Sequence, residues 1–147
     1  MKLTNRKGVT LVELVIVFVI IAIGAVLMVP NMGAWLPNYR LRSAARDITS
    51  SMRTAQLKAV STNMEYRVFF PNANSYVLQR NTGGFIDEGV VQTIPSGVSL
   101  DLSNLPGNNA QFNPNSTCSI GSVTLTNTKG TQKKITLTPA TGKVKLE

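Results

Sequence analysis

The most strongly apolar stretch of the chain lies near its start. From Val9 to Val29 only Thr10 and Glu13 are clearly polar. As a helix rising 1.5 Å per residue, this run is about 31 Å long, which matches the hydrocarbon thickness of a bilayer. We therefore predict that residues 9–30 form a transmembrane helix.

Beyond this run the pattern becomes amphipathic. Pro30 and Gly33 mark a point where the helix bends or loses hydrogen bonds, and Pro37 is a second weak point. Apolar residues then recur at spacings of three and four, which places them on one face of a helix. We predict that the helix continues through residues 31–63 and packs on a sheet through Leu41, Ala44 or Ala45, Ile48, Met52, Ala55 and Ala59.

From residue 64 to 147 the apolar period switches to two, which is typical of strands. Tyr66–Phe70 and Tyr76–Arg80 predict a hairpin, and Val90–Ile94 and Val98–Leu102 predict a second strand pair. A loop is expected over 103–119, followed by strands at Ser122–Thr126, Lys134–Thr138 and Lys143–Leu146. One long helix followed by strands alone predicts an α+β fold with an antiparallel sheet.

Positive charge, +8 in total, is concentrated in three places. Lys2, Arg6 and Lys7 precede the apolar run, where basic residues favour the cytoplasmic side of a membrane. All the remaining basic residues except Arg67 and Arg80 form two clusters: Arg40, Arg42, Arg46, Arg53 and Lys58 along the amphipathic helix, and Lys129, Lys133, Lys134, Lys143 and Lys145 near the end. Such clusters attract phosphates or other anions.

The residue types needed for most catalytic sites are missing. The chain has no histidine and one cysteine, so Ser-His pairs, Cys-His pairs and mixed Cys/His zinc sites are excluded. Cys118 is expected to be a small buried residue. Asp87 and Glu88 are adjacent in sequence, so in a strand they face opposite ways and make no acid/base pair. We predict a solvated loop there, no cofactor, no metal and no enzymatic activity.

Glu13 is the least expected residue of the apolar run. A carboxylate inside a membrane helix costs at least about 2.5 kcal/mol, so it needs a partner. A secretory signal would end in a small-residue cleavage site, but Met28-Val29-Pro30 follows here. Cleavage after Gly8 would instead create an amine at Val9, four residues from Glu13 on the same helix.

The residues around this point resemble the prepilin signal of type IV pilins and pseudopilins: Lys7-Gly8, then Val9-Thr10-Leu11-Val12-Glu13. The resemblance implies that a prepilin peptidase removes residues 1–8 as a leader peptide and methylates Val9. Glu13 stands at the family's acidic position and Pro30 at its helix-kinking proline. Most relatives have phenylalanine where this chain has Val9.

Further segments resemble pseudopilin H and the FimT-like minor pilins: Arg40–Ala45, Ala55–Ala59, Ile94–Val98, Phe112–Pro114 and Thr141–Lys145. This resemblance implies a type IV pilin-like fold and a structural subunit of a pilus-like filament. Its implied partners are other pilin or pseudopilin subunits, the prepilin peptidase and an inner-membrane assembly platform. The expected location is the bacterial inner membrane, with a single span and the globular domain in the periplasm.

Two alternatives stay open. Gly142-Lys143-Val144-Lys145 resembles a basic motif with which some FimT-like pilins bind DNA in natural transformation, with lysines in place of arginines. Lys129, Lys133 and Lys134 are candidates to extend that patch, against the simpler interpretation that lysines protect an edge strand from pairing. The second alternative is a pseudopilin of a type II secretion system.

Overall fold

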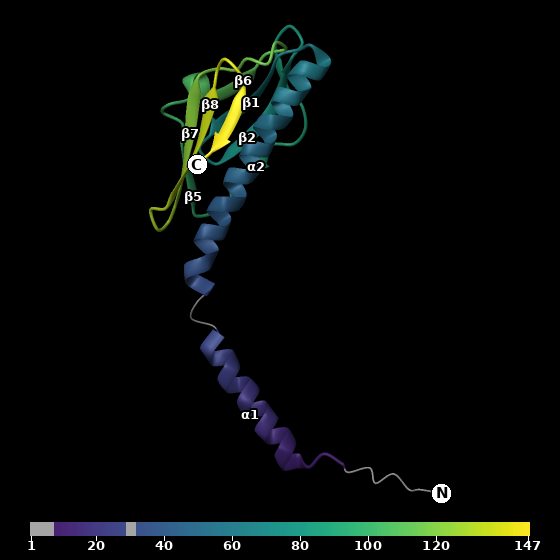
Figure 1. Cartoon of the computed structure of the whole chain (residues 1–147), viewed down its shortest axis with the longest axis vertical. Helices are drawn as coiled ribbons and strands as arrows, with labels where there is room; N and C mark the ends of the chain where they lie inside the picture. The colour runs from purple at the N-terminus through teal and green to yellow at the C-terminus, as the bar shows by residue number, and fades with distance from the viewer. Residues whose placement is uncertain (1–7, 29–31) are drawn as a thin grey trace, which may run out of the picture. The chain divides into compact units, whose positions relative to one another are not determined.

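The structure is a computed structural model that describes residues 8–28 and 32–147 (Figure 1). The chain divides into two compact units. The first ends at Trp35, and the second spans Leu36–Glu147. Pro30, the predicted kink, and residues 1–7 of the predicted leader lie outside the described residues.

The first unit contains α1, Leu11–Met28, which covers most of the apolar run. Its sequence is dominated by valine, isoleucine and leucine, and no charged residue follows Glu13 within it. Among the residues that the structure describes, no helix reaches both the length and the hydropathy of a membrane span.

The second helix, α2, runs from Met32 to Thr62, as the amphipathic pattern predicts. It ends because Asn63 adopts a left-handed conformation, with φ of 54°, which is a common way to stop a helix. In the last turn the hydroxyls of Ser61 and Thr62 donate hydrogen bonds to the Lys58 carbonyl, at 3.2 and 2.7 Å. These bonds tie both side chains back onto the last turn of the helix.

The first sheet is antiparallel and has the order β3-β2-β1-β6, with β4 also paired to β2. Its central hairpin, Tyr66–Asn72 (β1) and Ser75–Asn81 (β2), confirms the predicted pair. The other strands are short: Phe85–Asp87 (β3), Gln92–Thr93 (β4) and Asn109–Phe112 (β6).

The second sheet is also antiparallel and has the order β5-β7-β8-β9. It consists of Val98–Asp101 (β5), Gly121–Asn127 (β7), Gln132–Thr138 (β8) and Lys143–Leu146 (β9). The last three strands match the predicted ones within two residues. A short 3-10 turn, η2 at Pro106–Asn108, precedes β6.

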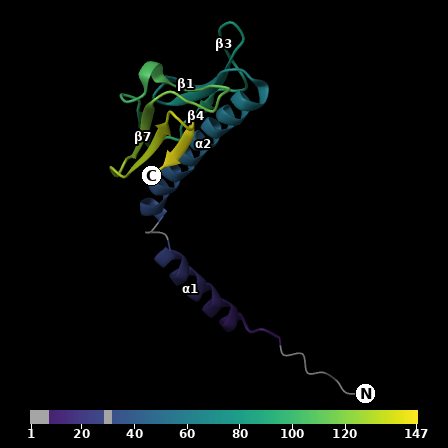
Figure 2. The same ribbon diagram turned by 45° about the horizontal axis from the view of Figure 1, so that its top comes forward.

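One hydrophobic core joins α2 to both sheets. All residues of the predicted apolar face of α2 are buried, and they share a cluster with Phe70 and Phe112 of the first sheet and Leu125 and Ile135 of the second. In Figures 1 and 2 the ribbon of α2 runs alongside the strands of the second unit. Burial of the helix face on antiparallel strands confirms the α+β prediction.

The predicted second strand pair is wrong. Gln92–Thr93 pairs with β2, whereas Val98–Asp101 pairs with β7, so the two segments belong to different sheets. The predicted loop over 103–119 contains β6, which pairs with β1, and β3 was not predicted either. The sequence therefore predicts one sheet where the chain forms two.

Candidate assembly helix and cationic surfaces

The predicted processing site directly precedes α1. Gly8 and Val9 are exposed, and no atom lies within 4 Å of where a Cβ on Gly8 would stand. Thr10 occupies the N-cap position, since α1 begins at Leu11. Cleavage after Gly8 and methylation of Val9 stay predictions.

Thr10 and Glu13 form a reciprocal cap at this end of α1. The Thr10 amide and hydroxyl both donate to Glu13 Oε2 at 2.9 Å, and the Glu13 amide donates to Thr10 Oγ1 at 3.3 Å. This is a capping box, in which each side chain satisfies a backbone amide of the other residue. The Thr-x-x-Glu spacing is visible in the sequence, but sequence reasoning assigned Glu13 only to an amine at Val9.

Within the described part of the first unit, the side chains of α1 have almost no cover. Its large apolar residues from Leu11 to Val26 are 48–79% exposed, on every side of the helix. A soluble protein rarely exposes a contiguous apolar surface of this extent, and such a surface marks contact with another protein or with lipid. α1 therefore presents the kind of surface that lipid or another protein covers.

The structure places the five candidate DNA-binding lysines on the outer face of the second sheet, on its inner face and in a turn. Residues alternate faces along a strand, and Ile135, Leu137 and Val144 point into the core. Three lysines therefore lie on the outer face: Lys134 on β8, and Lys143 and Lys145 on β9.

The other two lysines are separate from this outer row. Lys133 stands two residues before Ile135 on β8, so its side chain lies on the same inner face of the sheet, and it is half-buried. It lines a groove with Arg42, Ala45, Arg46 and Leu146. Lys129 lies in the turn between β7 and β8, where its amide donates to Asn127 Oδ1 at 2.9 Å.

An acidic residue reduces the charge of the outer row. Lys145 Nζ lies 2.6 Å from Glu147 Oε1, and this hydrogen bond is the main cause that lowers the Glu147 pKa below its usual value. The charge of Lys134 lowers it further. The cationic surface is consequently smaller than the count of lysines in the sequence indicates.

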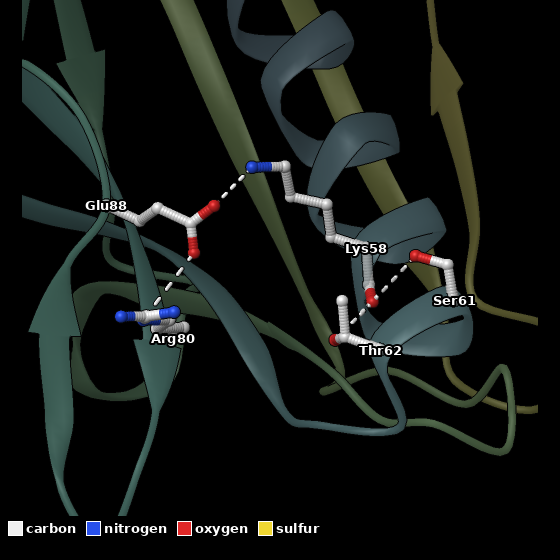
Figure 3. Close-up of polar contacts among 5 residues, drawn as sticks. All are labelled: Lys58, Ser61, Thr62, Arg80 and Glu88. Carbon is white, nitrogen blue, oxygen red and sulfur yellow. Dashed lines mark hydrogen bonds and ion pairs between the residues drawn. The ribbon is translucent and has the colours of Figure 1, made fainter.

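The two adjacent acids at the end of β3 serve structure. Glu88 forms an ion pair with Lys58 of α2, and its second oxygen lies 3.9 Å from Arg80 Nε (Figure 3). The Lys58 hydrogen bond is the largest cause that lowers the Glu88 pKa. Asp87 accepts a hydrogen bond from Gln79 Nε2 at 2.7 Å. The prediction of a simple solvated loop missed these ion pairs and this hydrogen bond.

Within the described ranges, no group of three or more potential ligands is placed to hold a metal ion. Cys118 is buried, as predicted, and its Sγ donates to the Thr138 carbonyl at 3.4 Å. Burial raises the pKa of its thiol, which disfavours the reactive thiolate.

Comparison of the solved structures finds the same fold in two kinds of filament subunit. The minor pseudopilin EpsH of the Vibrio cholerae type 2 secretion system has a TM-score of 0.61 at 11% identity, covering 74% of this chain and 96% of EpsH. The type IV minor pilin FimU of Pseudomonas aeruginosa has a TM-score of 0.60 at 14% identity, covering 75% of this chain and 90% of FimU. Among curated proteins there is no significant match.

Two family models match the sequence. The prokaryotic N-terminal methylation motif matches residues 3–29, which include Gly8, Val9 and Glu13. The model of type II transport protein GspH matches residues 44–141, from the buried face of α2 to the turn before β9. Together they confirm the resemblance to pilin-like proteins and to pseudopilin H. The chain belongs to the GspH family, whose members are structural pilin and pseudopilin subunits and not enzymes.

Proposed function

We propose that this chain is a membrane-anchored minor subunit of a pilus-like filament, cleaved after Gly8 and assembled through α1. The observation that carries the proposal is the exposure of the apolar side chains of α1. The N-terminal methylation motif over residues 3–29 supports the processing step. On this account a prepilin peptidase cuts the chain and methylates Val9, and an inner-membrane platform takes up the mature subunit.

The physical driving force differs before and after assembly. In the membrane, lipid tails cover α1, while Lys2, Arg6 and Lys7 hold the start of the chain on the cytoplasmic side. In the filament, the corresponding helices of other subunits replace the lipid. Both surroundings are apolar, so the exchange depends on packing and on polar contacts rather than on leaving water.

Glu13 has two separable roles in this account. Its capping box satisfies amides at the start of α1 in the single chain. After cleavage, its negative charge is available to the amine of Val9 in its own or a neighbouring subunit. A single buried polar residue of this kind sets register between helices more than it adds stability.

A matched pair of variants separates these roles. Glu13→Gln keeps a side chain that completes a capping box but removes the charge, whereas Glu13→Ala removes both. The quantity measured is the fraction of the chain recovered in sheared filaments. We expect both variants to fold the Leu36–Glu147 unit normally and both to enter filaments poorly.

Normal incorporation of Glu13→Gln would show that charge pairing is not needed and would restrict Glu13 to capping. Normal incorporation of both variants would contradict the assembly role of Glu13 altogether. Pro30→Ala, at the family's kink position, is a third variant for the same assay, with reduced incorporation expected.

The filament system is either a type II secretion pseudopilus or a type IV pilus. The GspH family match favours the secretion pseudopilus, while the fold is shared with subunits of both systems. Deletion of the gene discriminates between them. Loss of exoprotein secretion with intact pili supports a pseudopilin, and loss of surface pili with intact secretion supports a minor pilin.

DNA binding is a second candidate function, favoured by the outer face of the second sheet. Lys143 stands opposite Thr138, and Lys145 opposite Thr136, on adjacent strands. Lysines and threonine hydroxyls are common donors to phosphate oxygens. Three lysines on this face would give a salt dependence with a log–log slope of about −3.

The test is titration of labelled duplex DNA with the detergent-solubilised chain. Lys143→Ala/Lys145→Ala is expected to abolish binding, and Glu147→Gln to strengthen it by freeing Lys145. Lys133→Ala serves as the control, because its side chain belongs to the other face. Equal losses for the double variant and for the control would contradict a specific outer-face site.

A further inference from the structure

The groove beside Lys133 brings three cations together without an acid. Arg42 and Arg46 lie on α2, Lys133 comes from the start of β8, and Ala45 and Leu146 complete the lining. The groove has a volume of about 220 Å³, several times that of a water molecule. Of the ion pairs among the described residues, none involves these three side chains.

The two arginines are neighbours along the helix. Their spacing of four residues puts them about 6 Å apart along the axis and on one face, and both are exposed. A like-charged pair at this spacing destabilises a helix. Asp47, the nearest acid in sequence, is hydrogen-bonded to Ser43 Oγ at 3.4 Å. The groove thus presents unneutralised positive charge held by rigid elements.

The same helix face carries aromatic residues upstream. Tyr39, 54% exposed, lies three positions before Arg42, and Trp35, 61% exposed, lies four positions before Tyr39. By helical spacing Tyr39, Arg42 and Arg46 fall on one stripe. Aromatic rings followed by cations are typical of the membrane–water interface, where rings lie at headgroup level.

The position of Arg42 along the chain also agrees with a place near the membrane–water interface. Arg42 lies about 9 Å of helix after Leu36, where the second unit begins. No acidic residue stands between Glu13 and Asp47 in the sequence. Basic residues close to a membrane-inserted segment gain attraction from anionic lipids, at about fivefold in affinity for each residue.

We propose that the groove formed by Arg42, Arg46 and Lys133 binds the phosphate of an anionic phospholipid headgroup. The arginines chelate phosphate oxygens through their planar donors, and Lys133 closes the site from the strand side. A groove of this size admits one headgroup and not a duplex. This inference rests on the proposed membrane anchorage, and it gives the subunit a lipid contact outside its helical anchor.

The test uses the full chain in neutral detergent, titrated with phosphatidylglycerol or with zwitterionic phosphatidylcholine. Native mass spectrometry counts the bound lipid. The groove variant is Arg42→Gln/Arg46→Gln/Lys133→Gln. The control variant, Arg53→Gln/Arg80→Gln/Lys129→Gln, removes the same charge from exposed positions that do not line the groove.

Wild type is expected to prefer phosphatidylglycerol. The groove variant should bind it about 100-fold more weakly, at about fivefold for each cation lost, and the control variant should change less than about threefold. Lys133→Gln alone should cost about fivefold. Amide exchange of core strands checks that each variant remains folded. If the groove variant does not fold, Lys133→Gln alone tests the proposal.

Three results would overturn the proposal: no preference over phosphatidylcholine, equal losses in both triple variants, or displacement of the lipid by equimolar glycerol 3-phosphate or duplex DNA. Filament incorporation is scored separately. A chain that enters filaments but ignores phosphatidylglycerol overturns the lipid site alone. A chain with an intact lipid preference that stays out of filaments overturns the proposed function alone.

Discussion

The two helices of this chain carry apolar residues in opposite ways. α1 is apolar on all sides, and Ile20 within it is 63% exposed. α2 buries one stripe of apolar residues, and Ile48 on that stripe is fully buried. The same residue type is thus buried against strands in one helix and exposed in the other.

This difference indicates where the stabilising partner of each helix lies. The α2 stripe is completed intramolecularly by both sheets, so it contributes to the free energy of unfolding of the second unit. α1 has no such cover within the first unit, and lipid or other subunits can supply equivalent contacts. Its sequence is therefore expected to affect assembly rather than the stability of the Leu36–Glu147 unit.

The largest expected effect contrasts two isoleucines. Ile48→Ala should destabilise the second unit by about 2–5 kcal/mol, because it removes buried methylenes and leaves a cavity. Ile20→Ala should change that free energy by less than about 0.5 kcal/mol. Urea unfolding of the detergent-solubilised chain, monitored through amide exchange in β1 and β7, measures the free energy of unfolding of both variants. A comparable loss from Ile20→Ala would break the comparison.

Two glycines give a smaller contrast. Gly142 has φ of +61°, and a Cβ there would stand 2.5 Å from the Ser116 carbonyl oxygen and 2.6 Å from Gln56 Nε2. Gly142→Ala should therefore cost roughly 1–3 kcal/mol through strain and collision. Gly24 in α1 meets no atom within 4 Å. Gly24→Ala should leave the free energy of unfolding of the second unit unchanged. The same urea titration measures both glycine variants.

Two carboxylates give the smallest contrast. Glu88→Gln should destabilise the second unit by about 0.5–1 kcal/mol at neutral pH, the range for a partly exposed ion pair. Because the Glu88 pKa is lowered in the fold, its contribution is present above the ordinary glutamate pKa of about 4.3. It disappears as the pH falls through the lowered value.

Stability measured against pH tests this prediction. The curves of wild type and Glu88→Gln should converge in acid, and parallel curves down to the lowest pH would exclude the ion pair as the cause. Glu13→Gln should leave the unfolding of the second unit unaltered at every pH, because the Glu13 carboxylate is hydrogen-bonded to Thr10 within the first unit.

The sequence predicts the local parts of the fold well. The α2 stripe follows from its three-and-four spacing, and the β1–β2 hairpin follows from alternation around a short turn. The strands β7, β8 and β9 follow from alternation between glycine-containing turns. In each of these elements, residues close in sequence determine the structure.

The elements that were predicted wrongly pair with strands that are distant in the sequence. Val98–Asp101 pairs with β7 across more than twenty residues, not with the adjacent Gln92–Thr93. Asn109–Phe112 alternates polar and apolar residues over only four positions, too few to predict a strand, and it pairs with β1 more than thirty residues earlier in the chain. No local pattern distinguishes these partners from the nearer alternatives.

The candidate sites show the same division. That Lys133 and Lys134 face opposite ways follows from their adjacency on a strand, a signal present in the sequence but not used. Lys133 meets Arg42 and Arg46 only through the packing of α2 on the second sheet. The pairing of Lys58 with Glu88 likewise requires the tertiary fold.

The most direct test of the central claim is the intact mass of this chain in purified, sheared filaments. The account predicts a subunit that begins at methylated Val9 and is present in the filament fraction. Recovery of the chain with its leader attached, or its absence from filaments while the mature form remains in the membrane, would contradict assembly through α1.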